Sequence, residues 1–409
     1  RYQELLETLA REVPTWSAEP GVDDGPDGQK LPRVNLSLKL SALDSRINSL
    51  DPAGSVNRLV ERLMPLVTRA REVGAFVNLD MELCLHPALK DYPHLGVVVQ
   101  AYLRDSMGDL ERVEALARKR GTPVTVRLVK GAYWDYETVL AQQRGWPCPV
   151  FSEKSHTDAN YEKLSARMIA GWQHVRPAFG SHNVRSLAYA VALARQQGVP
   201  EKAIEVQALF GMAEPMRKAL RNLGLRVRVY APVGELLPGM AYLVRRLLEN
   251  TSNQGFLRGS YAEHKDPSVL LGAPAAATGK EPPVVLPRET FPNSPFIDLS
   301  LPTEHDAFTR ALSDVRRDWL GKDHPAVVAG TPVTSGAWET SVNPHDRSEV
   351  IGRVARREGA AGRAEGLRDM GGHAVGDPRV RAGEGRGPHG EGPAAPGRPH
   401  HAGGGETVA

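Results

Sequence analysis

Cysteine is scarce in this 409-residue chain, and long apolar runs are absent from it. Its two cysteines, Cys84 and Cys148, cannot build a disulfide framework, which favours a reducing compartment. No stretch approaches the roughly 18 apolar residues of a membrane-spanning helix, and no signal peptide is visible. The net charge of +3 is too small to favour nucleic acid or an anionic membrane as a partner. The HExxH and CxxC spacings are also missing, so we expect no metal site.

The end of the chain lacks the residues that build a core. Residues 356–409 contain no Ile, Phe, Tyr or Trp and are rich in Gly, Arg, Ala, Pro and His. Such a segment cannot bury enough apolar surface to offset the entropy of ordering, so we expect it to be disordered. Gly385, Gly387 and Gly390 satisfy G-x-G-x-x-G, but no strand precedes them and no helix follows. The dinucleotide-binding motif requires that context, so we give this match no weight.

Short β-type runs alternate with helix-type segments from about residue 34 to residue 234. This alternation predicts a parallel sheet with helices packed on its outside. Seven such units fit a (β/α)8 barrel that lacks one strand. Because the chain begins with the helical pattern RYQELLETLA, we expect the missing first strand to lie before residue 1. The seven runs are 34–41, 75–82, 96–102, 124–131, 178–182, 204–210 and 226–234.

The predicted strands carry polar residues on one face. In VNLSLKLS, Leu36, Leu38 and Leu40 alternate with Asn35, Ser37, Lys39 and Ser41. A period of two places the leucines on one face and the polar residues on the other. A strand buried on both faces is normally apolar throughout, so this pattern predicts a polar pocket inside the barrel.

The carboxyl ends of barrel strands meet at one mouth, where catalytic groups lie. A solvated strand end explains any one polar residue there, but polar residues recur at all seven ends. These candidates are Lys39, Asp80, Gln100, Arg127 with Lys130, His182, Gln207 and Tyr230.

The predicted helix PGMAYLVRRLLEN, 238–250, has two stripes at helical spacing. One is apolar, and the other holds Tyr242, Arg245, Arg246 and Glu249. The second stripe is either a solvated face with a Glu249–Arg245 pair or a binding face, since two guanidiniums suit a carboxylate. No activated nucleophile is apparent, which indicates that a cofactor carries the chemistry.

Several stretches of the chain resemble one enzyme family. KLSAL, RLVKGAYWD, KSHTDANYEKL, FGSHN, VQALFGMAEP, VRVYAPVG and AYLVRRLLEN, in this order, are similar to the FAD-dependent proline dehydrogenases. The resemblance is closest to the proline dehydrogenase half of bifunctional bacterial proline utilisation A, and it covers roughly residues 1–300. It implies a (β/α)8 barrel that binds FAD and oxidises L-proline to Δ1-pyrroline-5-carboxylate, the first step of proline catabolism to glutamate.

The resemblance implies roles at the flavin and at the substrate. Arg127 and Lys130 would contact the flavin, with Arg127 near N5, which receives hydride from proline C5. Gly131 and Ala132 would let backbone approach the cofactor. Other residues on the cofactor side would be Met81, Gln100, Trp134, His182, Asn183, Gln207 and Glu249.

For proline itself, the resemblance implies a carboxylate site made by Lys39, Arg245 and Arg246. Tyr230 and Tyr242 would pack on the ring, and Tyr133 would help to close the pocket. Asp80 would belong to a hydrogen-bond network around the site. The catalytic residues are thus expected to be Arg127, Asp80 and Tyr133.

The resemblance also divides the chain. We expect the barrel in 1–258, a linker and short helix in 259–325, the start of an aldehyde dehydrogenase domain in 326–355, and the disordered tail in 356–409. SVNPHDRSEVIGRVA resembles the opening of that second domain, but the likeness stops near Ala355. We therefore expect an out-of-frame tail, without the NAD-dependent glutamate semialdehyde dehydrogenase activity. A barrel without its first strand should bind FAD weakly and turn over poorly.

Alternatives to this function stay open. A 4-hydroxyproline dehydrogenase is one, although Tyr230 would crowd a substituted ring. A non-catalytic barrel that binds an amino acid is another, and RNA binding by the Arg/Gly tail is disfavoured because interleaved aromatic residues are missing. The resemblance further implies a membrane quinone as electron acceptor and a cytoplasmic protein, peripheral at the inner face of the membrane. Whether the chain forms a homo-oligomer is left open.

Overall fold

The computed structural model describes residues 1–26, 28–79, 92–234, 237, 239–240, 242–245, 266–274, 296–328, 330–334 and 336–356. The described residues fall into two compact units, one spanning Arg1–Ile297 and the other beginning at Asp298. Each unit is considered by itself.

The first unit is built on a seven-stranded sheet in which every neighbouring pair is parallel. The order of the strands in the sheet is their order in the sequence, which is the arrangement of a β/α barrel. The strands are β1 Asn35–Leu38, β2 Phe76–Leu79, β3 Leu95–Gln100, β4 Val124–Val129, β5 Val175–Gly180, β6 Glu205–Leu209 and β7 Arg226–Tyr230. Each of the seven predicted runs overlaps one strand, although β3 begins one residue and β5 three residues before its run, so the α/β barrel-type prediction is confirmed.

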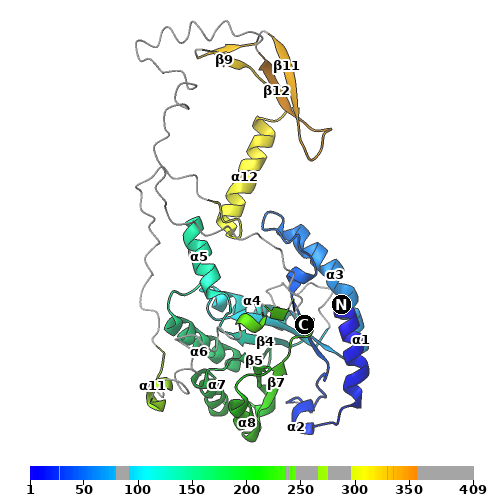
Figure 1. Cartoon of the computed structure of the whole chain (residues 1–409), viewed down its shortest axis with the longest axis vertical. Helices are drawn as coiled ribbons and strands as arrows, with labels where there is room; N and C mark the ends of the chain where they lie inside the picture. Colours follow the sequence, from blue (N-terminus) through cyan, green and yellow to red (C-terminus); the bar gives the residue numbers. More distant parts are fainter. Residues whose placement is uncertain are drawn as a thin grey trace, which may run out of the picture. The chain divides into compact units, whose positions relative to one another are not determined.

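Helices follow the strands and flank the sheet (Figure 1). Local signals set their ends. The carboxylate of Asp51 caps α3 by accepting from the Gly54 N–H, and Pro52 takes the first turn. Gly121 ends α4 with a φ of 72°, a conformation in which glycine meets no steric cost. The helices are α1 Tyr2–Glu12, α2 Pro20–Asp23, α3 Pro52–Glu72, α4 Ser106–Arg120, α5 Trp134–Arg144, α6 Lys154–Ala170, α7 Val184–Gln196, α8 Glu214–Asn222 and α11 Pro267–Leu270.

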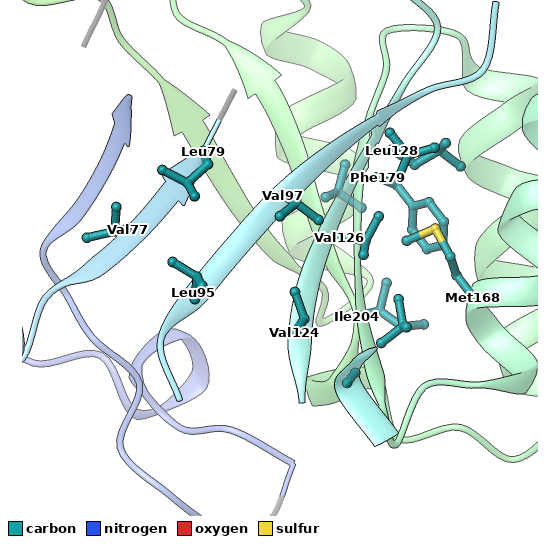
Figure 2. Packing of buried hydrophobic residues seen from close by; sticks show 14 of the residues in the cluster. Val77, Leu79, Leu95, Val97, Val124, Val126, Leu128, Met168, Phe179 and Ile204 are labelled. Carbon is teal, nitrogen blue, oxygen red and sulfur yellow. The ribbon is translucent and has the colours of Figure 1, made fainter. Parts of the chain in front are cut away.

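The core lies between the outer face of the sheet and these helices. Figure 2 shows alternate residues of β2, β3 and β4 directed into it, together with Phe179 of β5 and Met168 of α6. Leu36 and Leu38 of β1 belong to the same cluster and are almost fully buried. The leucine face predicted for VNLSLKLS is therefore the outer, helix-covered face.

The sheet curls so that its two edge strands approach the same side chain. Arg127 stands on the central strand β4, yet its guanidinium contacts Ser37 of β1 and lies by the ring of Tyr230 of β7. Arg226, also on β7, donates to the carbonyl oxygens of Val22 and Asp24, which precede β1 in the chain. A flat sheet of seven strands would keep these residues far apart, because neighbouring strands are about 4.8 Å apart.

The second unit contains a helix and short strands. Helix α12, Pro302–Asp318, lies within 259–325, where a linker and a short helix were expected. Strands β11 and β12 are antiparallel, β12 pairs with β8 in parallel, and β9 pairs with β10. The strands are β8 Lys322–His324, β9 Ala326–Val328, β10 Thr331–Val333, β11 Ala337–Val342 and β12 Val350–Arg356.

Two expectations fall outside this description. A strand before residue 1 would lie beyond the chain, and residues 357–409 of the predicted tail lie outside the described residues. Among the described helices, none combines the length and the apolar character needed to cross a bilayer.

Candidate active site

Arg127 occupies the middle of the inner face, and three strands supply its neighbours. Its Nη1 donates to Oγ of Ser37 at 3.3 Å. The amide of Asn78, in the orientation that satisfies both of its polar atoms, accepts from Nη1 at 3.0 Å and from Nη2 at 3.1 Å. The ring of Tyr230 lies 5.6 Å from the guanidinium carbon, within cation–π range. Three strands thus hold one cation in a fixed direction.

Two glycines make room for inner-face side chains next to this arginine. Gly96 on β3 lies beside Asn78 in the sheet register, and a Cβ there would come within 2.5 Å of the Asn78 amide. Gly180 on β5 leaves space for the side chain of β4, because its Cβ would meet Val129 at 3.0 Å and Arg127 Cγ at 3.8 Å. Side chains of the neighbouring strands thus occupy the space that a Cβ would take at each of these two positions.

Tyr133 and Arg245 meet at the mouth. Arg245 donates from Nη1 to the Tyr133 hydroxyl at 2.9 Å, and its guanidinium carbon lies 5.2 Å from the Tyr133 ring centre. On the same helical stretch Tyr242 is 7% exposed, whereas Leu243 of the apolar stripe is 43% exposed. The polar stripe therefore turns toward the protein, which favours a binding face over a solvated one.

His182 stands directly after β5, and its side chain is hydrogen-bonded to the neighbouring strand β6. Its Nε2 accepts from the backbone N–H of Leu209 at 3.1 Å, so the neutral ring carries its proton on Nδ1. The next residue, Asn183, caps α7, because its Oδ1 accepts from the N–H of Ser186 at 3.2 Å. The family resemblance implied that both residues contact the cofactor. In the structure, His182 also links β5 to β6, and Asn183 also caps α7.

Lys130 points away from the inner face. Its ammonium group pairs with the carboxylate of Asp158 on α6 and lies 5.6 Å from the centre of the Tyr161 ring. Burial lowers the pKa of Lys130 to about 8, although Asp158 opposes that shift. Lys130 is thus not grouped with Arg127, and its predicted flavin contact would have to come from its backbone.

The loop after β4 is shaped by two aromatic residues. Gly131 has a φ of 123°, and a Cβ there would come within 2.4 Å of the Tyr102 ring. This close approach requires glycine independently of any cofactor. Trp134 donates from Nε1 to the Phe151 carbonyl oxygen at 2.7 Å and begins α5. Ala132, between Gly131 and Tyr133, is exposed.

A partly buried ion pair lies below the mouth on β6 and β7. Arg228 makes two hydrogen bonds of 2.9 Å to the Glu205 carboxylate, and Gln207 donates from Nε2 to the same carboxylate at 2.7 Å. Burial by itself would raise the pKa of Glu205, but the charge and hydrogen bonds of Arg228 outweigh it and lower that pKa. The third bond directs the amide oxygen of Gln207 away from Glu205.

Of the remaining predicted site residues, the structure describes Lys39 and Gln100. Lys39 follows β1, and its backbone N–H donates to the Tyr2 hydroxyl at 3.2 Å. Gln100 ends β3. Asp80, Met81, Arg246 and Glu249 lie outside the described residues. Within the part of the chain that the structure describes, no group of three His, Cys, Asp or Glu side chains could hold a metal ion.

Sequence reasoning missed the partners that hold the central arginine. Asn78 and Ser37 stand two residues before the predicted strand-end groups Asp80 and Lys39, on the same face of β2 and β1. The signal was present in the alternation of each strand, since a polar residue at an inner position costs free energy unless it has a partner. Gly96, Asp158 and the Glu205–Arg228 pair were missed as well.

Residues 1–259 match the proline dehydrogenase family. The chain belongs to this family. Sequence relatives agree with that result. The bifunctional protein PutA of Klebsiella aerogenes is 30% identical over 389 residues, which cover 86% of this chain and 28% of the relative. Proline dehydrogenase 2 of Bacillus subtilis is 29% identical over 231 residues, which cover 54% of this chain and 67% of the relative.

Solved structures with the same proline dehydrogenase fold also match. The chain is 41% identical to proline utilization A from Bdellovibrio bacteriovorus inactivated by N-propargylglycine, with a TM-score of 0.79, covering 87% of this chain and 38% of that one. A Bradyrhizobium japonicum PutA variant gives 29% identity and a TM-score of 0.64, covering 80% and 34%. The chain thus spans about 28% of the length of the PutA relative from Klebsiella and about a third of these structures.

Proposed function

We propose that this chain catalyses the FAD-dependent oxidation of L-proline to Δ1-pyrroline-5-carboxylate. Family membership supports the reaction class. The observation that carries the proposal is the central guanidinium of Arg127, which Ser37, Asn78 and Tyr230 hold inside the curled sheet. A fixed cation at the mouth is the group that this chemistry needs, because negative charge develops on the electron acceptor.

The residues around the mouth fit a flavin. The edge of an isoalloxazine ring carries several hydrogen-bond acceptors and one N–H donor. The inner face offers donors from Arg127, His182 and the Gln100 amide, and an acceptor from the Gln207 amide oxygen, which points away from Glu205. We therefore expect these four side chains to hold the cofactor, together with the backbone of residues 130–132.

The roles of the chain's own residues follow from charge and position. When bound, the flavin would supply the two-electron acceptor for hydride from proline C5. Arg127 would stabilise the charge that develops at the acceptor. Arg245 would bind the proline carboxylate together with Lys39 and Arg246, and its hydrogen bond to Tyr133 would orient the guanidinium.

Tyr230 favours unmodified proline over 4-hydroxyproline as the substrate. Its ring lies against Arg127, which limits how far it could move to admit a hydroxyl group on the substrate ring. Tyr242 is nearly buried on the adjoining helical stretch and would pack on the same substrate ring. Asp80 would complete the hydrogen-bond network of the site.

We further propose that a membrane quinone accepts the electrons and that the protein works in the cytoplasm, peripheral to the inner face of the membrane. Oxidation of glutamate semialdehyde, the second activity proposed for the longer bifunctional relatives, is not assigned to this chain.

The experiment is a cofactor and reduction test on the purified chain. We expect it to take up added FAD, with a flavin absorption spectrum, and L-proline to bleach that spectrum anaerobically. A quinone analogue should then restore the absorption. A chain that holds FAD without bleaching by proline would be a binding protein rather than a proline dehydrogenase. A chain that takes up no FAD would remove the flavin from the proposal.

A further inference from the structure

We infer that Asn78 is a positioning residue for Arg127, supported by Ser37 and made possible by Gly96. This inference rests on the proposed function, because it concerns how the cation of that site is aimed. Asn78 is 4% exposed and Ser37 is 7% exposed, so both are polar side chains inside the barrel. Buried polar groups cost free energy unless they are hydrogen-bonded. Their shared partner is the guanidinium of Arg127.

The contact between Asn78 and Arg127 passes over the strand that lies between theirs. Arg127 stands on β4 and Asn78 on β2, and β3 lies between them in the sheet. In the register, Arg127 is opposite Val98, whereas Asn78 is opposite Gly96. The guanidinium therefore reaches diagonally over β3, at a level where that strand has no side chain. A Cβ at position 96 would meet the Asn78 amide at 2.5 Å and the Phe76 ring at 2.9 Å.

Asn78 and Ser37 fix the direction of the Arg127 guanidinium without cancelling its positive charge. The single amide oxygen of Asn78 accepts from both terminal nitrogens of Arg127, at 3.0 and 3.1 Å, which aims the end of the guanidinium at this oxygen. An amide and a hydroxyl are neutral, so Asn78 and Ser37 leave the positive charge of the arginine available. A carboxylate at position 78 would hold the arginine equally well but would neutralise it.

That contrast defines the experiment, which uses Asn78→Ala, Asn78→Asp and Gly96→Ala in the full chain with added FAD. Asn78→Ala should lower kcat about tenfold to a hundredfold, as expected when a hydrogen bond to a charged group is lost. The KM for proline should change less than threefold, because the carboxylate site is not altered. The flavin midpoint potential should shift to a more negative value. Asn78→Asp should shift that potential further still, although its thermal stability stays closer to that of the parent.

Gly96→Ala should reproduce Asn78→Ala, since the added Cβ displaces the amide. Asn35→Ala is the matched control, because Asn35 faces inward on β1 and makes no hydrogen bond to Arg127 among those described. It should leave both kcat and potential unchanged. If Asn78→Ala lowers only the melting temperature and leaves the potential unchanged, Asn78 is merely structural and the inference is wrong.

A readout without cofactor separates this inference from the proposed function. Phenylglyoxal labelling of the flavin-free chain, read at Arg127 by mass spectrometry, should be faster in Asn78→Ala than in the parent, and unchanged in Asn35→Ala. Labelling at an equal rate in all three would overturn the inference. If the parent chain fails to bind FAD while the labelling result holds, the proposed function fails and the positioning of Arg127 stands.

Discussion

The two faces of the seven-stranded sheet differ in the side chains that they bury: the outer face is apolar and the inner face is polar and charged. On the outer face, Val77, Leu79 and Phe179 pack against helices with no exposed surface. On the inner face, two residues of β4 and β6, Arg127 and Glu205, keep their charges inside the fold. The outer face lowers the free energy of folding by removing apolar area from water. The inner face costs free energy unless every polar group finds a partner.

The comparison teaches where function resides in this sheet. A barrel needs only apolar side chains to fill its interior, as many barrels have. Here the interior holds an arginine aimed by an amide, a carboxylate bound to Arg228, and glycines that make space. Packing alone does not require such an arrangement, which agrees with the charged ligand proposed above. Changes on the outer face should therefore alter stability alone, whereas changes on the inner face should alter the chemistry at Arg127 or, where an ion pair is broken, stability as well.

The largest expected effect is on the outer face. Phe179→Ala removes a fully buried ring from the core and should lower the free energy of unfolding by about 3–5 kcal/mol. Chemical denaturation measures this change. The control is Leu223→Ala, at a side chain that is half exposed, for which we expect about 0.5 kcal/mol or less. Equal losses for the two variants would contradict the assignment of the outer face as the core.

Arg127→Met should have the next largest effect, on turnover rather than on folding. Removing a group that stabilises developing charge typically lowers kcat by about a hundredfold to a thousandfold. Steady-state proline oxidation with a dye acceptor measures it, and Arg195→Met, at an exposed arginine paired with Glu201, is the control. A variant that keeps parental kcat would remove Arg127 from the chemistry.

Glu205→Gln tests whether the Glu205–Arg228 ion pair on the inner face contributes to the stability of the fold. Loss of the carboxylate leaves Arg228 partly buried without its charge partner, so we expect about 2–3 kcal/mol less stability near pH 7. The lowered pKa of Glu205 means that its contribution is present above its unfolded value of 4.5 and is lost as the pH falls through the folded value. The difference between parent and variant should shrink in acid, as denaturation at several pH values would show. A difference that stays constant down to low pH would speak against the ion pair as its source.

The smallest effect concerns Lys130, which lies outside the inner-face group. Its pKa is lowered to about 8, so the folded chain releases this proton near pH 8 while the unfolded chain keeps it up to about 10.5. The unfolded state therefore binds more protons in this window, and the free energy of unfolding should rise by about 1 kcal/mol per pH unit. Lys130→Met should flatten that slope. An unchanged slope would show that the ammonium is not buried against α6.

Much of this architecture was readable from local patterns. The alternation in residues 34–41 predicted the inner position of Ser37, and seven runs predicted seven strands. The family motifs predicted that Tyr133 and Arg245 belong to one site, and the two side chains do meet. The partner of Lys130 was missed because Asp158 lies on a helix whose rotation no strand pattern specifies.

The sequence by itself determined the identity and the face of each strand, because the period of two is a property of the local backbone. Only the tertiary structure decided which residues meet. Arg127 gains Ser37, Asn78 and Tyr230 because the sheet curls and brings its two edge strands toward the central one. Curl depends on the twist accumulated over all seven strands. No single segment of the sequence contains that information.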